Sequence, residues 1–285
     1  MPAPSRERTI NASLTPMNAT TTPTPSHTTL RAAVLRPWGE TDPVSKAQTT
    51  LGLDLSWPVG AHEQLQAQSL GPGRAARPVL VPHTQLKAKS MTTPEGRAML
   101  VHAIAHIELN AIDLALDVVW RFAGMPEAFY TDWVRIAQEE AKHFSLLRQH
   151  LVSMGFDYGH FPAHNTLWDM AERTQGDILA RIGIVPRTME ARGLDASPGV
   201  KNKLVSVGDH RAGEILDIIL EDEIGHVAAG NRWYRYLCEE RGLDPVRTYA
   251  ELIAQYDAPK MRPPFNMAAR QSAGFSPEEL QLLRQ

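Results

Sequence analysis

Residues 101–120 read VHAIAHIELNAIDLALDVVW, and residues 132–151 read DWVRIAQEEAKHFSLLRQHL. Apolar residues recur at helical spacing in both stretches, which predicts two helices with one apolar face each. Glu108 lies on the apolar face of the first helix, and Glu140 and His143 lie on that of the second. A buried carboxylate is costly to desolvate unless a positive charge lies beside it. The pattern therefore predicts a bound cation, for which a metal ion is the simplest choice.

A third stretch, residues 215–230, repeats this pattern with the sequence ILDIILEDEIGHVAAG. Glu223 and His226 lie within its apolar stripe and form a Glu-x-x-His pair, as Glu140 and His143 do. Residues at i and i+3 share one face of a helix, so each pair presents a carboxylate and an imidazole together.

A further glutamate precedes each pair at a similar distance. Glu108 lies 140 − 108 = 32 positions before Glu140, and Glu190 lies 223 − 190 = 33 positions before Glu223. One Glu and one Glu-x-x-His from each half of the chain make the ligand set of the di-iron and di-manganese carboxylate bundles. Four carboxylates would balance two divalent ions in a buried site. The predicted ligands are Glu108, Glu140, His143, Glu190, Glu223 and His226, with Glu172 as the alternative to Glu190 on the third helix.

Composition narrows the class of protein. The chain has 285 residues, a formal net charge of −3 and a single cysteine, Cys238. This charge argues against a general nucleic-acid binder, and one cysteine excludes an intramolecular disulfide or a cysteine-based zinc cluster. The N-terminus has no continuous apolar stretch of a signal peptide, and no segment approaches the roughly 18 uncharged apolar residues of a membrane span. We expect a soluble, cytoplasmic protein.

The chain divides into four parts. Residues 1–29 are rich in Thr, Pro, Ala, Ser and Asn, which predicts a flexible tail. Prolines punctuate residues 30–92, which predicts an arm with one or two short helices wrapped around the remainder. Residues 93–242 form the predicted metal-binding bundle, and residues 243–285 form a C-terminal appendage of short helices. Strand alternation is too short to indicate a sheet, so we expect an all-α fold.

Four long helices are expected within the bundle. They lie at about 93–124, 126–153, 167–192 and 209–240, and Pro186 should kink or break the third. Ser197-Pro198-Gly199 is expected to form a connection before the fourth helix. The short link between the first two predicts antiparallel neighbours.

Other polar residues receive structural interpretations. His102 and His106, at i and i+4, have a spacing that can hold zinc, but a structural role, or a hydrogen bond to a ligand, is favoured. Asp113 and Asp117 are expected to pair with arginines of a neighbouring helix. The basic side chains of the arm are interpreted as solvated surface, with an anionic ligand as the alternative: Arg74, Arg77, Lys87 and Lys89.

Two acidic residues and four aromatic residues near the predicted ligands or in the predicted helices are assigned roles other than metal binding. Glu139 and Glu221 adjoin predicted ligands but face elsewhere, so they are interpreted as surface residues or as groups that surround the ligands. Core packing, rather than a radical or electron-transfer role, is expected for Trp120, Trp133, Trp233 and Tyr234.

Several runs resemble a bacterial family of ferritin-like proteins of unassigned function. They are HAIAHIELNAIDLALD, EEAKHF, FPAHNTLWDMAER, VPRTMEARGLD and EDEIGHVAAGNRWY, which occur in order between about residue 30 and the C-terminus. The resemblance implies a ferritin-like bundle and carries the ligand role onto the six residues above. The Glu190-Ala191-Arg192 turn is also similar to the third-helix ligand motif of the bacterial tRNA-modifying di-iron hydroxylases. The N-terminal tail belongs to neither pattern.

The leading hypothesis is a di-metal oxidoreductase, with iron ahead of manganese. It would activate oxygen or peroxide to oxidise a small organic substrate or a modified nucleoside. Carboxylate and imidazole ligands stabilise higher oxidation states and leave open positions for oxygen. An electron donor, tRNA and a second copy of the chain are the further partners considered. Metal storage or buffering is one alternative, and a non-catalytic helical bundle with a polar core is the other.

Overall fold

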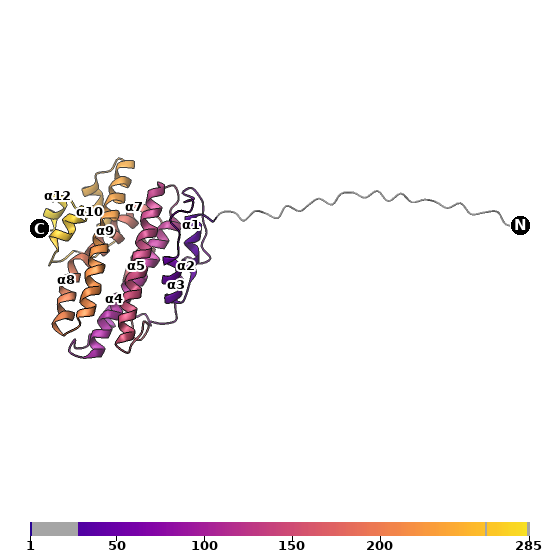
Figure 1. The fold of residues 1–285 in the computed structure, drawn as a ribbon. Helices are drawn as coiled ribbons and strands as arrows, with labels where there is room; N and C mark the ends of the chain where they lie inside the picture. The colour runs from indigo at the N-terminus through magenta and orange to yellow at the C-terminus, as the bar shows by residue number, and fades with distance from the viewer. Residues whose placement is uncertain (2–27, 260, 284–285) are drawn as a thin grey trace.

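The computed structural model describes residues 1, 28–259 and 261–283, and every regular element within these residues is a helix (Figure 1). The only β pairing among the described residues is an isolated parallel bridge between Leu80 and Ala163. The predicted all-α class is therefore confirmed.

Three long helices lie side by side at the centre of the molecule (Figure 1). They are α4 (Pro94–Arg121), α5 (Glu127–Ser153) and α9 (His210–Glu240). The Thr93 side chain caps α4 by accepting a hydrogen bond from the Gly96 amide, and the Asp209 side chain caps α9 through the Ala212 amide. α5 packs against both α4 and α9, so it is the central helix of the three.

The third helical segment differs most from its prediction. The continuous helix expected at 167–192 is divided into α6 (Thr166–Arg173), α7 (Ile178–Ile184) and a π-helical turn, η2 (Val185–Glu190). η2 then continues directly into α8 (Ala191–Ser206). α7, η2 and α8 all pack along α9.

The connection predicted at Ser197-Pro198-Gly199 was wrong, because these residues lie inside α8. A proline within a helix leaves the carbonyl four residues earlier without its usual donor. Here that carbonyl belongs to Leu194, and the Asn266 side-chain amide donates to it at 3.2 Å. A residue distant in the sequence thus replaces the missing hydrogen bond.

The N-terminal arm packs along the outer side of α4 and α5. It contains α1 (Leu30–Ala33), α2 (Leu35–Gly39), α3 (Pro43–Leu51) and a short 3₁₀ turn, η1 (His83–Gln85). Arg31 is fully buried and donates to the Val119 and Trp120 carbonyls at the end of α4, both at 2.9 Å. This guanidinium satisfies carbonyls that the helix end leaves free. The flexible tail predicted at 1–29 lies almost entirely outside the described residues.

The C-terminal part contains α10 (Pro245–Gln255), α11 (Met267–Ser272) and α12 (Pro277–Leu282). α10 packs on α7 and α9, and α11 packs on α8 and α9, so the C-terminal part covers the segmented third helix. Ser276 and Glu279 form a capping box at the start of α12.

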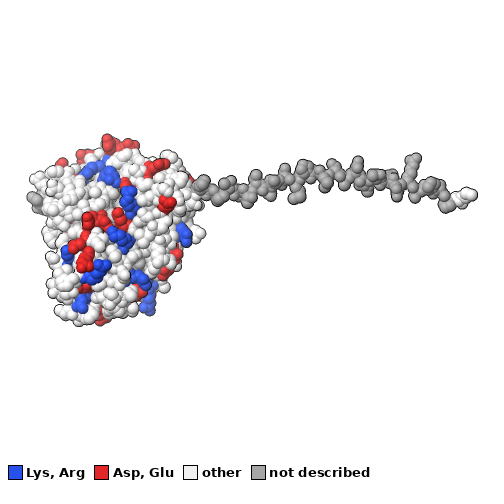
Figure 2. All heavy atoms as spheres, viewed as in Figure 1, with Lys and Arg blue, Asp and Glu red and all other residues white. Residues whose placement is uncertain are grey.

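One helix in the described part of the chain, α4, is long and apolar enough to cross a membrane by length and composition. Within its most apolar window, 67% of the residues are buried against other parts of the structure. α4 is therefore the core helix of the fold. Acidic and basic side chains are interspersed over the face shown in Figure 2.

Candidate metal centre

Five of the six predicted ligands converge between α4, α5 and α9. Two groups have ligand atoms that all lie within 4.8 Å of one another: Glu108, Glu140 and His143 form one, and Glu140, Glu223 and His226 form the other. Glu140 belongs to both. The structure thus presents two adjacent three-residue sites that share one carboxylate.

The two oxygens of Glu140 face different histidines. Glu140 Oε2 lies 3.3 Å from His143 Nδ1, and Glu140 Oε1 lies 3.0 Å from His226 Nδ1. Glu108 Oε2 is 3.1 Å from His143 Nδ1, and Glu223 Oε2 is 3.8 Å from His226 Nδ1. Glu140 therefore lies between the two histidines, with one carboxylate oxygen directed to each.

Each histidine is held from its outer side by a carboxylate of the other helix. His143 on α5 places Nε2 2.9 Å from Asp222 Oδ2 on α9, and His226 on α9 places Nε2 2.8 Å from Glu139 Oε2 on α5. A metal-bound histidine commonly donates its second ring N–H to a carboxylate, which fixes the ring and its tautomer. The arrangement leaves both Nδ1 atoms directed to the carboxylates between the helices, where they could serve as metal ligands.

The sequence interpretation identified only part of these outer carboxylates. Glu139 was assigned to the surface or the surroundings of the ligands, and it contacts His226. Glu221 was given the same role, but it is exposed, and its neighbour Asp222 performs it. The signal in the sequence is an acidic residue immediately before the glutamate of each Glu-x-x-His pair, in Glu139-Glu140 and Asp222-Glu223.

Glu190 ends the π-helical turn η2 and is the third-helix candidate. It lies outside both three-residue groups, but its charge interacts with Glu140, His226 and Glu108. The alternative, Glu172, is exposed on α6 and accepts a hydrogen bond from Trp168 Nε1 at 3.0 Å. The structure therefore favours Glu190. Single π turns inside α-helices recur at functional sites.

The η2 turn approaches α9 closely and is tied to the C-terminal part. A Cβ at Gly230 would lie 3.0 Å from the Pro186 side chain, so glycine permits this approach. Thr188 on η2 is 2.8 Å from the Tyr249 hydroxyl on α10. Arg187, which is 1% exposed, pairs with Glu279 on α12. α10 and α12 thus brace the turn that carries Glu190.

Burial sets the ionisation of the carboxylates when no metal is present. It raises the pKa of Glu108 to about 7 and that of Glu190 to about 8, and the charge of Glu140 adds to both shifts. Burial likewise raises the pKa of Glu223 well above its ordinary value. For Glu140, burial would have the same effect, but the neighbouring His226 and His143 lower its pKa instead. Burial therefore favours the protonated form of Glu108, Glu190 and Glu223, whereas the two histidines favour the ionised form of Glu140.

Burial alone would lower the pKa of each ligand histidine, but the adjacent carboxylates reverse this. Glu108 and Glu140 raise the pKa of His143 to about 11. Glu140 and Glu139 raise that of His226. The neighbouring carboxylates thus favour the protonated, positively charged form of both histidines.

Several buried atoms at the centre have no hydrogen-bond partner among the described residues. They are Glu190 Oε2 and Glu223 Oε2, together with Glu140 Oε1 and His226 Nδ1, whose one contact is the 3.0 Å ion pair that they make with each other. Buried polar atoms are normally satisfied, and three carboxylate oxygens beside an imidazole nitrogen make a donor set for a divalent transition metal. These residues therefore suit the predicted metal ions.

The other predicted polar residues have structural contacts. His102 Nε2 accepts a hydrogen bond from the Gly159 amide, and neither His102 nor His106 has a hydrogen bond to a candidate ligand among the described residues. Asp117 pairs with Arg181 of α7, as predicted, but Asp113 pairs with Lys46 of the arm rather than with an arginine. The four aromatic residues assigned to the core are buried: Trp120, Trp133, Trp233 and Tyr234.

Comparison with known proteins gives a family without an assigned activity. Residues 39–281 match the model of a family described as "Protein of unknown function (DUF455)". The chain is 47% identical over 211 residues to an uncharacterized protein of Haemophilus influenzae, which covers 72% of this chain and 73% of that protein. No solved structure shows a significant match. The chain therefore belongs to the DUF455 family.

Proposed function

We propose that this chain is a di-iron oxidoreductase built on a ferritin-like four-helix bundle, in which α4, α5, the segmented α7–η2–α8 and α9 are the four helices. The observation that carries the proposal is the pair of three-residue sites that share Glu140. In carboxylate bundles, two helices each supply a Glu and two each supply a Glu-x-x-His. Here α4 and η2 would supply Glu108 and Glu190, and α5 and α9 would supply the two pairs.

The proposed charge balance supports two divalent ions. Glu108, Glu140, Glu190 and Glu223 carry four negative charges when ionised, and two divalent ions carry four positive charges. A buried centre tolerates ions only when their charges are compensated. Burial raises the pKa values of Glu108, Glu190 and Glu223, so these carboxyl groups hold protons that metal binding would displace, and metal uptake should release protons.

Oxygen and nitrogen ligands of this kind accept both iron and manganese. We propose iron ahead of manganese because iron would supply the redox chemistry with oxygen or peroxide. The chain's own contribution is positional. Asp222 and Glu139 hold the two imidazoles, Glu140 fixes the separation of the two sites, and η2 places Glu190 beside them. Apart from Glu190, which is partly exposed, the ligand side chains are buried. A substrate must therefore be a small organic molecule, or must present a small reactive group such as a nucleoside modification.

The test is iron loading under anaerobic conditions, followed by exposure to oxygen and by absorption spectroscopy. We expect about two iron ions per chain and new absorption bands on oxygen exposure. Glu140→Ala should remove both ions, whereas Glu221→Gln, an exposed neighbour of the site, should retain them. Binding of two ions without any reaction with oxygen or peroxide would reject the oxidoreductase. If the chain also assembled into a closed shell of many copies, metal storage would be the better account of its function.

A further inference from the structure

Among the described residues, Glu279 of α12 supplies the only hydrogen bond to the side chain of Arg187. Arg187 is 1% exposed and pairs with Glu279 through Nη2, whereas its Nε and Nη1 are buried without a partner. Glu279 also accepts from Arg235 Nη2 at 3.2 Å. α12 is the last helix of the chain and lies beside the C-terminus (Figure 1). A helix at the end of the chain thus neutralises a charge in the interior.

Aromatic rings surround this guanidinium. Its carbon atom lies 4.7 Å from the ring centroid of Tyr234 on α9, 4.2 Å from that of Tyr249 on α10 and 5.1 Å from that of Phe275. Such rings attract a cation, but they have no net charge that could replace the carboxylate. Removal of one partner from a buried ion pair leaves an uncompensated charge and is strongly destabilising. Loss of Glu279 would therefore favour any rearrangement that gives Arg187 a new partner.

The turn that carries Arg187 also sets the direction of Glu190. Both residues belong to η2, and Glu190 ends it. In a π-helical turn the N–H group bonds to the carbonyl five residues earlier, so the turn contains one residue more than an α-helical turn. A return to α-helical bonding would shift Glu190 by one residue, or about 100° around the helix axis. The register of η2 therefore decides whether Glu190 faces the metal centre.

Glu190 is also the acid that a change of register would offer to Arg187. In the present register, the charge of Glu190 interacts with Glu140 and His226 of the centre, and its Oε2 is buried without a hydrogen-bond partner among the described residues. Residues at i and i+3 share one face of an α-helix, so an α-helical turn would bring Glu190 and Arg187 together. A Glu190 that pairs with Arg187 would be lost as a metal ligand.

We propose that Glu279 is a positioning residue for Glu190. Through Arg187, it holds η2 in the register that directs Glu190 to the metal centre, so the docking of α12 and the binding of metal favour each other. This inference rests on the proposed metal-binding function and adds regulation to it, because a partner or a cleavage that displaces α12 would weaken metal binding. Coupling between two binding events is reciprocal, so bound metal should in turn hold α12 in place.

Metal affinity tests the first half of this coupling. Titration of the full-length protein with cobalt(II) against a competing chelator measures both binding steps in the wild type, Glu279→Ala and Glu278→Ala. Glu279→Ala should weaken one step at least about tenfold, the lower end of the cost of losing a group that supports a metal ligand. Glu278→Ala removes the same charge from the neighbouring, exposed position of α12 and should leave both steps unchanged. Equal affinities in the wild type and Glu279→Ala would overturn the proposal.

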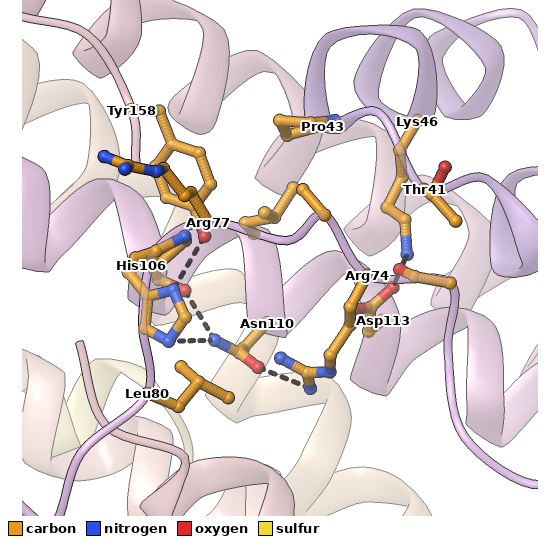
Figure 3. A pocket seen from close by; sticks show the side chains of 14 residues that line it. Thr41, Pro43, Lys46, Arg74, Arg77, Leu80, His106, Asn110, Asp113 and Tyr158 are labelled. Atoms are coloured by element: carbon orange, nitrogen blue, oxygen red, sulfur yellow. Dashed lines mark hydrogen bonds and ion pairs between the residues drawn. The ribbon is translucent and has the colours of Figure 1, made fainter. Parts of the chain in front are cut away.

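Asp113→Ala controls for a loss of stability alone. Asp113 is the carboxylate partner of buried Lys46 in a polar pocket between the arm and α4 (Figure 3), and the two side chains are 3% and 2% exposed. No residue that lines this pocket belongs to η2 or to the C-terminal part. The change should lower the melting temperature and leave the metal affinity unchanged. If it weakened metal binding as much as Glu279→Ala does, lost stability would explain both results, and the positioning role would be rejected.

A double-mutant cycle shows whether Glu279 acts through Glu190. Glu190→Gln should weaken the same binding step as Glu279→Ala does. Residues that act through one another are not additive, so adding Glu279→Ala to Glu190→Gln should cause no further loss of affinity. Two losses that add in full would show that Glu279 does not act by placing Glu190, and would overturn the proposal.

Hydrogen exchange measures the reciprocal effect. Bound cobalt(II) should slow the exchange of the α12 amides at least about tenfold in the wild type, and it should not do so in Glu190→Gln. Exchange that is unchanged by metal in the wild type would overturn the coupling. A wild-type chain that binds no metal would reject the proposed function and the role of Glu190 with it. Two bound ions in the wild type, with the same affinities in Glu279→Ala, would reject this inference alone.

Discussion

Removal of the Asp222 carboxylate should weaken one metal site and spare the other. Asp222 Oδ2 lies 2.9 Å from His143 Nε2, and Lys142 holds the same oxygen at 2.7 Å. Loss of such an outer carboxylate typically costs ten- to a hundredfold in metal affinity, or about 1.4–2.8 kcal/mol. Asp222→Asn keeps a carbonyl acceptor for the ring N–H, so we expect a loss of about tenfold. Asp222→Ala removes the acceptor and should approach a hundredfold.

The effect should be specific to the site that contains His143. The equivalent change at the other histidine is Glu139→Gln, since Glu139 Oε2 lies 2.8 Å from His226 Nε2. Stepwise titration with iron(II) or cobalt(II) against a competing chelator resolves the two affinities. Each variant should weaken one of the two binding steps. The Lys142 side chain is 46% exposed, so the loss of its ion pair with Asp222 should add little to the change in metal affinity.

Glu221→Gln is the matched control, because it removes one negative charge from the residue next to Asp222, and Glu221 is exposed. It should change neither affinity. If Asp222→Ala and Glu221→Gln bound metal equally well, the Asp222 contact would have no part in holding His143 for a metal. The account of the outer carboxylates would then be refuted.

Three further predictions follow from the centre and its supports. In the presence of a chelator, the free energy of unfolding should fall from about pH 4.5 to about pH 8, because burial raises the folded-state pKa of Glu108 from 4.5 to about 7 and that of Glu190 from 4.5 to about 8. Stability from these protons is fully present below the ordinary carboxyl pKa and is lost as the pH rises through the folded values. A melting temperature that rises over this range would contradict it. Glu279→Ala should lower the free energy of unfolding by about 3 kcal/mol in chemical denaturation, since it leaves buried Arg187 without its partner. A change below about 0.5 kcal/mol would show that the ion pair contributes little to stability. Gly230→Ala should lower metal occupancy by displacing η2, because its Cβ would crowd the Pro186 side chain at 3.0 Å; elemental analysis showing full occupancy would refute that.

The sequence predicted the long helices well because their apolar faces are periodic and their caps are local. Thr93 and Asp209 cap α4 and α9 as their side chains suggest. The third helix was harder, since the Leu194 carbonyl freed by Pro198 is satisfied by Asn266, which lies far away in the sequence. No local pattern contains that contact.

In the candidate site, too, the features set by local sequence were predicted and those set by distant contacts were not. Spacing and periodicity selected Glu108, Glu140, His143, Glu223 and His226, and the structure brings all five together. The π turn that carries Glu190 depends on braces from α10 and α12, so its form could not be derived from residues 185–190 alone. The crossed contacts of Asp222 and Glu139 depend on the register of α5 against α9, which the sequence does not specify.

Metal content per chain tests the central claim most directly. Protein purified without a chelator, then loaded with iron(II) under anaerobic conditions, should contain about two iron ions per chain by elemental analysis. Glu140→Ala should contain none, because Glu140 belongs to both sites. A wild-type protein that binds no metal under any loading condition, or a Glu140→Ala variant that retains two ions, would contradict the account.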